Sequence, residues 1–320
     1  MEAVRTVGLS KTYPGGVRAL DGVDLEVEEG RVFAVLGPNG AGKTTLIRIL
    51  TAQIRPTSGR AYVLGHDVMK EEARVREVVG YVPQEISVWT DLTGYENLLI
   101  YAKLYGADRR AVREVLDFMG LGEAADRLVR TYSGGMVRRL EIACALLKRP
   151  RVLLLDEPTV GLDPAARRLI WARLLELKKL GTTIFFSTHY MDEAEHYADE
   201  VALLNRGRVV ARGPVEALRR EVGGDAVIAE VDDVVKAAQL ARGAGYSAVA
   251  EGDRLMVFSA SPGEDLPRLL AVFIKGGVAV KRVYVKNATL DDVFMKLVGK
   301  PAEGGDLKSA KSVRKAVKRA

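Results

Sequence analysis

Gly37-Pro38-Asn39-Gly40-Ala41-Gly42-Lys43-Thr44 is the stretch that decides the fold. It fits the pattern G-x-x-x-x-G-K-S/T, between a strand expected over residues 31–36 and a helix expected over residues 43–51. Glycines let backbone N–H groups close around phosphate oxygens, and Lys43 supplies a cation for the outer phosphates. The Thr44 hydroxyl is a suitable ligand for Mg²⁺. We therefore predict a loop that binds a nucleoside triphosphate, with Thr45 also among the binding residues.

Asp156 and Glu157 end a second apolar run, residues 152–155, which we expect to be a buried strand. Ligands of open α/β sheets collect at the carboxyl ends of strands, so Asp156 can ligate Mg²⁺ there, directly or through water. Glu157 follows, where it can orient or deprotonate the attacking water. An acidic pair after a strand is often only a solvated turn, but the apolar run and the phosphate loop favour the catalytic interpretation.

The first two thirds of the chain predict a parallel sheet wrapped in helices. Strands expected over residues 4–9 and 17–27 should form a small antiparallel sheet around a turn at Pro14-Gly15-Gly16. Residues 93–148 keep helical spacing, which indicates a mostly helical insertion. Strands and helices then alternate, with strands at 152–155, 182–187 and 201–204 and helices at 164–179 and 191–197.

After Gly223-Gly224 the pattern changes to the order βαββαβ, which is typical of a ferredoxin-like small domain. Its elements are expected at residues 227–231, 232–241, 246–250, 255–259, 264–275 and 278–285. A further helix, residues 290–298, is expected to pack onto this domain. The predicted domains are residues 1–222 with a helical subdomain at about 88–148, a small α+β domain at residues 223–301, and a basic tail at residues 302–320.

The most specific motif is Tyr132-Ser133-Gly134-Gly135-Met136, followed by residues 137–143. It resembles the signature sequence of the ATP-binding subunits of ABC transporters, and its flanking Tyr132 and Met136 are similar to the drug and polysaccharide exporter branch, in particular the daunorubicin-resistance type. Residues 289–294 resemble the sequence that closes the small C-terminal domain of that branch. The resemblance implies an α/β fold of the P-loop NTPase class: an ABC cassette with a mixed sheet core, an antiparallel β subdomain and a helical subdomain, then the ferredoxin-like domain.

The same resemblance implies roles for four residues elsewhere in the chain. Tyr13 falls where an aromatic ring stacks on adenine, although a tyrosine that only packs against a hairpin remains an alternative. Gln84 matches the glutamine that reaches Mg²⁺ and the γ-phosphate, and His189 matches the histidine that contacts the γ-phosphate. Asp163 matches the loop through which two subunits contact each other, and it is also an ordinary helix cap before Pro164.

Two subunits share each ATP in the family that the sequence resembles. The Ser133 hydroxyl and the Gly134 and Gly135 amides of one subunit would donate hydrogen bonds to ATP held by the other. The implied partners are therefore a second copy of the chain, or a homologous subunit, and an integral membrane permease subunit. The implied cofactors are ATP and Mg²⁺. Motion would reach the permease through a groove between the Gln84 loop and the helical insertion near residues 92–98.

The implied function is ATP hydrolysis that drives transport, in particular export of a drug-like, lipid or polysaccharide substrate, from the cytoplasmic face of the cell membrane. The alternative is a soluble ABC-type ATPase that acts on nucleic acid, ribosomes or cofactor assembly. Ribosome-acting members usually carry two cassettes in one chain, and DNA-repair members carry long coiled coils or zinc modules. The sequence shows neither feature.

Composition excludes several other classes of protein. With 320 residues, 48% of them hydrophobic and 28% charged, the chain fits a globular protein of about two domains. Cys144 is the single cysteine, so an internal disulfide is excluded. The longest run without Asp, Glu, Lys or Arg, residues 180–191, is too short for a bilayer span of about 20 residues. The N-terminus shows no export signal.

The net charge of +6 lies in the C-terminal tail. Residues 307–320 carry six Lys and Arg residues and no acid, so the rest of the chain is balanced, which argues against a nucleic-acid partner. The lysines of this segment recur at helical spacing, and weak contact of a basic helix with anionic lipid is one interpretation. Composition favours the other interpretation, a solvated disordered tail.

Overall fold

The computed structural model describes residues 1–221 and 224–298. A four-stranded antiparallel sheet stands at the N-terminus in the order β2-β1-β4-β5. Its strands are β1 (Glu2–Thr12), β2 (Arg18–Glu28), β4 (Ser58–Val63) and β5 (His66–Asp67). β1 pairs with both β2 and β4, so the predicted antiparallel sheet is confirmed, with two strands that the sequence analysis missed.

A six-stranded sheet forms the centre of the cassette in the order β10-β9-β3-β8-β7-β6. Its members are β3 (Val32–Leu36), β6 (Val79–Val82), β7 (Val152–Asp156), β8 (Thr183–Thr188), β9 (Glu200–Asn205) and β10 (Arg208–Gly213). The strands from β9 to β6 pair in parallel, and β10 pairs antiparallel to β9 at one edge. Every residue of β3, β7 and β8 is buried, because helices cover both faces of the sheet.

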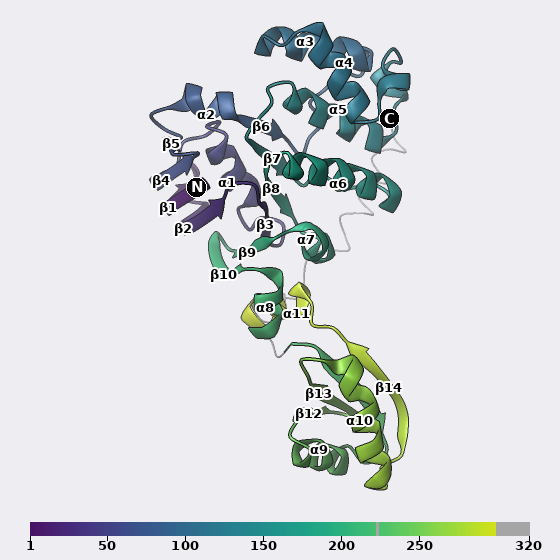
Figure 1. Cartoon of the computed structure of the whole chain (residues 1–320). Helices are drawn as coiled ribbons and strands as arrows, with labels where there is room; N and C mark the ends of the chain where they lie inside the picture. Colours follow the sequence, from purple (N-terminus) through teal and green to yellow (C-terminus); the bar gives the residue numbers. More distant parts are fainter. Residues whose placement is uncertain (222–223, 299–320) are drawn as a thin grey trace, which may run out of the picture.

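Successive side chains of β3 enter two different cores. Phe33 and Val35 pack in one core with α1 (Lys43–Leu50) and the N-terminal sheet. Ala34 and Leu36 pack in the other core with α5 (Gly134–Leu146) and α6 (Pro164–Lys179). The helix that follows the phosphate loop therefore lies on one face of the sheet, and the helix that follows the signature lies on the other (Figure 1).

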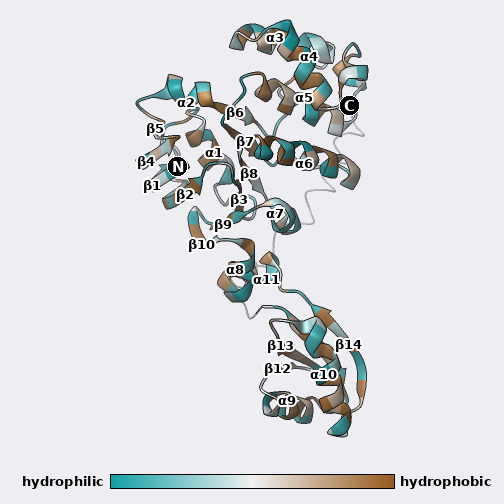
Figure 2. Ribbon diagram, viewed as in Figure 1, coloured by the Kyte–Doolittle hydropathy of each residue, from teal (hydrophilic) through white to brown (hydrophobic). Residues whose placement is uncertain are grey.

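Residues 93–148 are mostly helical, as their spacing predicts. Short α2 (Glu72–Val78) precedes β6, and then α3 (Gly94–Tyr105) and α4 (Arg109–Phe118) lead through two 3₁₀ turns to α5. Thr93, Asp108 and Ser133 cap the three helices by accepting backbone N–H groups. α4 buries Val112 and Leu116 and carries five charged residues, so hydrophilic and hydrophobic positions alternate along it in Figure 2.

The C-terminal unit has the predicted βαββαβ order. It comprises β11 (Ala226–Val231), α9 (Val234–Gly243), β12 (Ser247–Glu251), β13 (Arg254–Phe258), α10 (Pro262–Lys275) and β14 (Val280–Lys286). The antiparallel strand order β12-β13-β11-β14 is that of a ferredoxin-like sheet. Leu255, Leu269 and Phe273 belong to a separate core between this sheet and its two helices. The expectation of a ferredoxin-like fold is confirmed.

Helix α11 (Leu290–Val298) corrects one prediction. It packs against α8 (Val215–Glu221) and α7 (Met191–Tyr197) of the cassette, so the expectation that it packs onto the ferredoxin-like unit was wrong. Leu290 and Val293 are fully buried in the same core as Trp171. The Glu195 carboxylate of α7 accepts the Leu290 N–H, which favours this position because a helix N-terminus attracts negative charge.

We expect Leu290→Ala to destabilise the cassette by about 2–5 kcal/mol, because it leaves a cavity in the core that α11 shares with Trp171. Trp89 and Trp171 are the two tryptophans, so a Trp89→Phe background leaves Trp171 as the reporter of urea unfolding. The control is Val235→Ala on the exposed side of α9, expected within about 0.5 kcal/mol of the parent. An unchanged Trp171 transition in Leu290→Ala would contradict the docking of α11.

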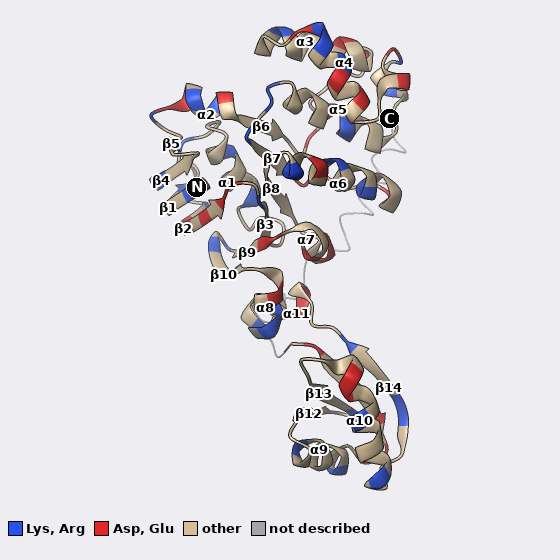
Figure 3. Ribbon diagram, in the orientation of Figure 1, with Lys and Arg blue, Asp and Glu red and all other residues tan. Residues whose placement is uncertain are grey.

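Charges of both signs are interspersed over the cassette (Figure 3), as the balanced composition outside the tail predicts. The basic tail, and with it the interpretation as a lipid-binding helix, lies outside the described residues. Within residues 1–221 and 224–298, none of the helices combines the length and the apolar composition that crossing a bilayer requires.

Candidate active site

The predicted site residues gather where four parallel strands end. The phosphate loop follows β3, Gln84 follows β6, and His189 follows β8. Asp156 is the last residue of β7, and Glu157 comes directly after it. These strands are adjacent and parallel, so their carboxyl ends share one edge of the sheet. Residues from distant parts of the sequence thus meet beside the N-terminus of α1 (Figure 1).

The phosphate loop requires glycine at two positions. A Cβ on Gly37 would lie 2.2 Å from the Leu204 carbonyl oxygen, and one on Gly42 would lie 2.3 Å from the Ala19 carbonyl oxygen. Gly42 also has a φ of 109°, in the left-handed region that favours glycine. No side chain caps α1 at Gly42, so the first N–H groups of the helix stay available to an anion.

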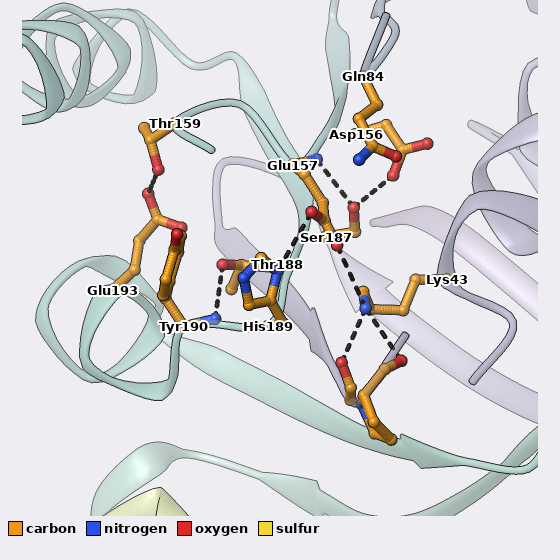
Figure 4. A network of polar contacts seen from close by, with 12 residues as sticks. Lys43, Gln84, Asp156, Glu157, Thr159, Ser187, Thr188, His189, Tyr190 and Glu193 are labelled. Atoms are coloured by element: carbon orange, nitrogen blue, oxygen red, sulfur yellow. Dashed lines mark hydrogen bonds and ion pairs between the residues drawn. The ribbon is translucent and has the colours of Figure 1, made fainter. Parts of the chain in front are cut away.

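Lys43 links this loop to Glu157. The side chain is only 5% exposed, and its ammonium donates to the Gly37 carbonyl at 2.7 Å and to the Pro38 carbonyl at 3.2 Å. The same nitrogen lies 3.3 Å from Glu157 Oε1. Figure 4 shows Lys43 on one side of the Glu157 carboxylate and His189 on the other.

Asp156 has a buried oxygen that lacks a partner. Its Oδ1 accepts a hydrogen bond of 2.6 Å from the Ser187 hydroxyl, but its Oδ2 has no partner among the described residues although Asp156 is 1% exposed. A buried carboxylate oxygen without a donor is costly unless a cation or a donor reaches it. Gln84 follows β6, which pairs with the β7 strand that ends at Asp156, and Thr44 is the second residue of α1. Oxygen atoms of this kind fit Mg²⁺.

Glu157 is held in an unusual backbone conformation. Its φ is 47°, in the left-handed region that few residues other than glycine adopt, and such strain concentrates at functional sites. Its N–H donates to the Ser187 hydroxyl at 3.0 Å and to the Ser187 carbonyl at 3.2 Å. Its Oε2 lies 3.1 Å from His189 Nδ1, so the carboxylate stands between two basic groups.

Ser187 is a site residue that the sequence analysis did not select. It contacts both acids, because its hydroxyl donates to Asp156 and accepts from the Glu157 N–H. The signal was present in the sequence, since Ser187 and Thr188 are polar residues at the end of an apolar strand, directly before His189. A fully buried hydroxyl at such a position needs partners, which here are the two acids of the neighbouring strand.

Tyr13 lies next to the helix of the phosphate loop. Its hydroxyl is 3.3 Å from the Thr45 hydroxyl, and the Lys11 ammonium is 5.3 Å from the centre of its ring. The Tyr13 N–H donates to the Val17 carbonyl within the hairpin turn. Tyr13 thus contacts both the hairpin and the binding loop, and its role against adenine stays a prediction.

The signature and the Asp163 loop lie together, apart from α1. Ser133 and Gly134 are exposed, and a Cβ on Gly135 would lie 2.7 Å from Ala166 Cβ at the start of α6. Asp163 caps α6 by accepting the N–H groups of Ala165 and Ala166 at 2.9 Å, and these bonds lower the pKa of its carboxyl. Within one chain these groups are therefore on the opposite face of the sheet from α1.

Comparison with known proteins identifies the family. The chain is 39% identical to the daunorubicin/doxorubicin resistance ATP-binding protein DrrA of Streptomyces peucetius, over 94% of each chain. The family model described as ABC transporter matches residues 20–160. The chain belongs to the ATP-binding subunits of ABC transporters. A second family model, the DrrA1-3-like C-terminal domain of ATP-binding proteins, matches residues 213–298 of this ABC subunit.

Other members of the family agree with this result. The subunit is 38% identical to the Nod factor export ATP-binding protein I of Ralstonia nicotianae, over 92% of each chain. It also matches a solved ATP-binding cassette, dimeric in a post-hydrolysis state with ADP and Pi, with a TM-score of 0.61 and 28% identity over 66% of this chain and 98% of that one.

Family membership confirms three predictions. The fold is that of an ABC cassette, and the chain is the ATP-binding, ATP-hydrolysing subunit of a transporter. Subunits of this family dimerise and work with membrane permeases. The comparisons support this function and not the alternative of a soluble ATPase that acts on nucleic acid, ribosomes or cofactor assembly.

Proposed function

We propose that the chain drives an ABC exporter by hydrolysing ATP at two sites formed between two subunits. The observation that carries the proposal is the Glu157 carboxylate, held between Lys43 and His189 beside the partnerless oxygen of Asp156. Relatives named for daunorubicin resistance and Nod factor export support export of a drug-like, lipid or polysaccharide substrate. Because the permease partner spans the membrane, we place this subunit peripherally on its cytoplasmic face.

Binding of ATP starts with the phosphate loop. The N–H groups of residues 37 and 39–45, which include the start of α1, would donate to the phosphates, and Tyr13 would stack on the adenine ring. Thr44, Gln84 and Asp156 would hold Mg²⁺, with the free Asp156 oxygen supplying the carboxylate ligand. When bound, the ion neutralises charge on the phosphate oxygens.

ATP competes with Glu157 for Lys43. The Lys43 ammonium bonds to two neutral carbonyls and one carboxylate, and phosphate oxygens offer it stronger, charge-assisted bonds. When Lys43 turns to the phosphates, Oε1 of Glu157 loses its cation and becomes available to the attacking water as a base. His189 keeps its bond to Oε2, and its second ring nitrogen can face the γ-phosphate.

The second half of each ATP site comes from another subunit. The exposed Ser133 hydroxyl and the amides of Gly134 and Gly135 would donate to the γ-phosphate held by the partner, which is a second copy or a homologous chain. Asp163 lies beside this signature. The segment that would contact the partner's ATP and the loop that would contact the partner subunit are therefore neighbours.

The permease would dock beside the Gln84 loop. A cavity of about 310 Å³ opens there, lined by residues that include Pro83, Ser87 and Tyr101. Ile86 and Trp89 are exposed apolar side chains in the same loop, at 67% and 48%. Exposed apolar groups around a cavity are typical of a protein–protein contact. A permease bound at this cavity would contact the same segment of the chain that carries Gln84.

Gly134→Asp tests the shared site. A Cβ on Gly134 meets Leu162 Cδ2 at 3.4 Å, which is tolerable, so the variant is expected to fold and to bind ATP through its own phosphate loop. Its new carboxylate would repel the γ-phosphate of the ATP that the partner holds. ATP hydrolysis should therefore fall at least ~100-fold, and ATP-dependent dimerisation should be lost as well.

The matched control for this variant is Gly134→Ala, which adds the Cβ without the charge and should keep most of the hydrolysis. Hydrolysis is measured by phosphate release. Dimerisation is measured by size-exclusion chromatography with ATP in a Glu157→Gln background, in which hydrolysis does not separate the two subunits. Wild-type turnover in Gly134→Asp would exclude the signature from the ATP site.

A further inference from the structure

The Arg138 guanidinium is buried between three segments of the site. Arg138 lies on α5, just after the signature, and its side chain is 9% exposed. Its Nη1 donates to the Pro83 carbonyl at 2.6 Å, and its Nη2 donates to the Gln84 carbonyl at 3.2 Å. Nη2 also donates to the Glu157 carbonyl at 3.4 Å. One side chain thus joins the signature helix to the Gln84 segment and to the backbone of the proposed base.

Glu141 completes this contact one turn further along α5. Its Oε2 accepts from Arg138 Nη1 at 3.1 Å, and its side chain is 2% exposed. Its Oε1 accepts the Ser87 N–H at 2.6 Å and the Ser87 hydroxyl at 3.0 Å. The two charged residues therefore fix both ends of the segment 83–87, Arg138 at Pro83 and Gln84, and Glu141 at Ser87.

Stability alone does not account for a buried pair of this kind. Burial lowers the pKa of Arg138 and raises the pKa of Glu141, and each group opposes the shift of the other. Replacing both members of a buried ion pair with well-packed apolar residues of similar volume is often neutral or stabilising, because the lost attraction is offset by the removed cost of desolvating two charges. What the pair supplies is geometry, because a planar guanidinium donates in several fixed directions at once.

We propose that the Arg138–Glu141 pair positions the Gln84 segment and the Glu157 backbone for ATP hydrolysis. The inference rests on the roles proposed above for Gln84 and Glu157. The Glu157 peptide is held from both sides, with its N–H on Ser187 and its carbonyl on Arg138. Because its φ of 47° is unfavourable, these bonds hold the backbone from which the carboxylate projects between Lys43 and His189. Arg138 and Glu141 are positioning residues, since neither side chain contacts the reacting atoms.

The test is the double variant Arg138→Gln/Glu141→Gln in the full chain, which removes both charges together. We expect kcat for ATP hydrolysis to fall by about 10- to 100-fold, as displacement of a catalytic group by about 1 Å would cause. KM and the Kd for ATP should change by less than about threefold, because the phosphate loop is untouched. The melting temperature should fall somewhat, because the carbonyls of Pro83, Gln84 and Glu157 lose their charged donor, so kcat is measured well below it.

Two further variants separate positioning from a general effect on folding. Arg138→Lys keeps the charge, but a compact ammonium cannot reproduce the planar fork that reaches the carbonyls of Pro83, Gln84 and Glu157. Its kcat should therefore fall as in the double variant. If the double variant fails to fold, the kcat of Arg138→Lys alone tests the positioning role. The control is Arg173→Gln/Glu176→Gln, an Arg–Glu pair of the same spacing on α6, expected to keep wild-type kcat.

Three results would overturn the inference: wild-type kcat in Arg138→Lys, wild-type kcat in the double variant, or a loss of activity that unfolding of the variants at the assay temperature accounts for. Glu157→Gln is measured alongside. If Glu157→Gln hydrolyses ATP normally, the proposed base is wrong, whatever the pair does. If Glu157→Gln is inactive while the pair variants remain active, only the positioning role fails.

Discussion

Glu157→Gln is expected to hydrolyse ATP about 1,000-fold more slowly than the wild-type chain while it still binds ATP. An amide has almost the shape of the carboxylate but cannot accept the proton of the attacking water. It can still accept a hydrogen bond from Lys43, which lies 3.3 Å from the carboxylate. The variant should therefore keep the fold of the site and lose only the chemical step.

The measurement for Glu157→Gln is steady-state phosphate release together with ATP binding. Because hydrolysis no longer separates the two subunits, ATP should hold the variant as a dimer in size-exclusion chromatography, where the wild type does not accumulate one. Glu176→Gln, on the exposed side of α6, is the control and should behave as the wild type. Normal turnover in Glu157→Gln would remove this residue from the role of base.

The same variant identifies the permease. Trapped with ATP in its native membranes and purified gently, Glu157→Gln should carry a stoichiometric multi-span membrane protein, which mass spectrometry names. We expect that protein to determine which substrate is transported, since this chain supplies the ATP site. Recovery with ribosomes, nucleic acid or soluble proteins alone would contradict the export proposal.

Local sequence predicted the part of the site that parallel strands bring together. The phosphate loop, Asp156, Glu157 and His189 each follow an apolar strand directly, and the carboxyl ends of neighbouring parallel strands necessarily meet. Knowing where the strands end was therefore enough to expect these residues at one edge. The βαββαβ order of the C-terminal unit was predictable from local pattern, because each strand and each helix has its own hydrophobic period in the sequence.

Contacts between segments that are far apart in the sequence could not be predicted from local pattern. The apolar face of α11 shows that the helix is buried, but not whether the ferredoxin-like sheet or the cassette covers it. The choice depends on Glu195, almost a hundred positions earlier, which accepts the first N–H of the helix. The bonds of Arg138 to the carbonyls of Pro83, Gln84 and Glu157 are equally non-local, and no spacing in the sequence indicates them.

Short strands with mixed polarity were missed for a different reason. β4 has three exposed residues at its start, and β10 has no fully buried residue. Neither gives the alternating or continuous apolar run by which strands are predicted. Their pairing comes from the neighbours: β4 adds to the free edge of β1, and β10 adds to the free edge of β9.

Lys43→Met is expected to weaken ATP binding at least ~100-fold, which corresponds to about 3 kcal/mol. Methionine fills a similar volume but cannot donate to the outer phosphates. It also leaves the Gly37 and Pro38 carbonyls without the donor that they have now, and it leaves the buried Glu157 carboxylate without its nearest cation. Unfolding free energy should therefore fall as well, by about 1–3 kcal/mol, from the unpaired buried groups.

The double variant Lys43→Met/Glu157→Gln separates these two effects of Lys43. Removing the carboxylate together with the ammonium leaves no uncompensated charge, so urea unfolding should return toward the wild type. ATP affinity, measured by titration calorimetry, should stay as weak as in Lys43→Met, because the phosphates still lack their cation. If the double variant recovers stability but not ATP affinity, Lys43 is a direct ligand of the phosphates. If it recovers both, Lys43 affects ATP binding only through the fold of the site.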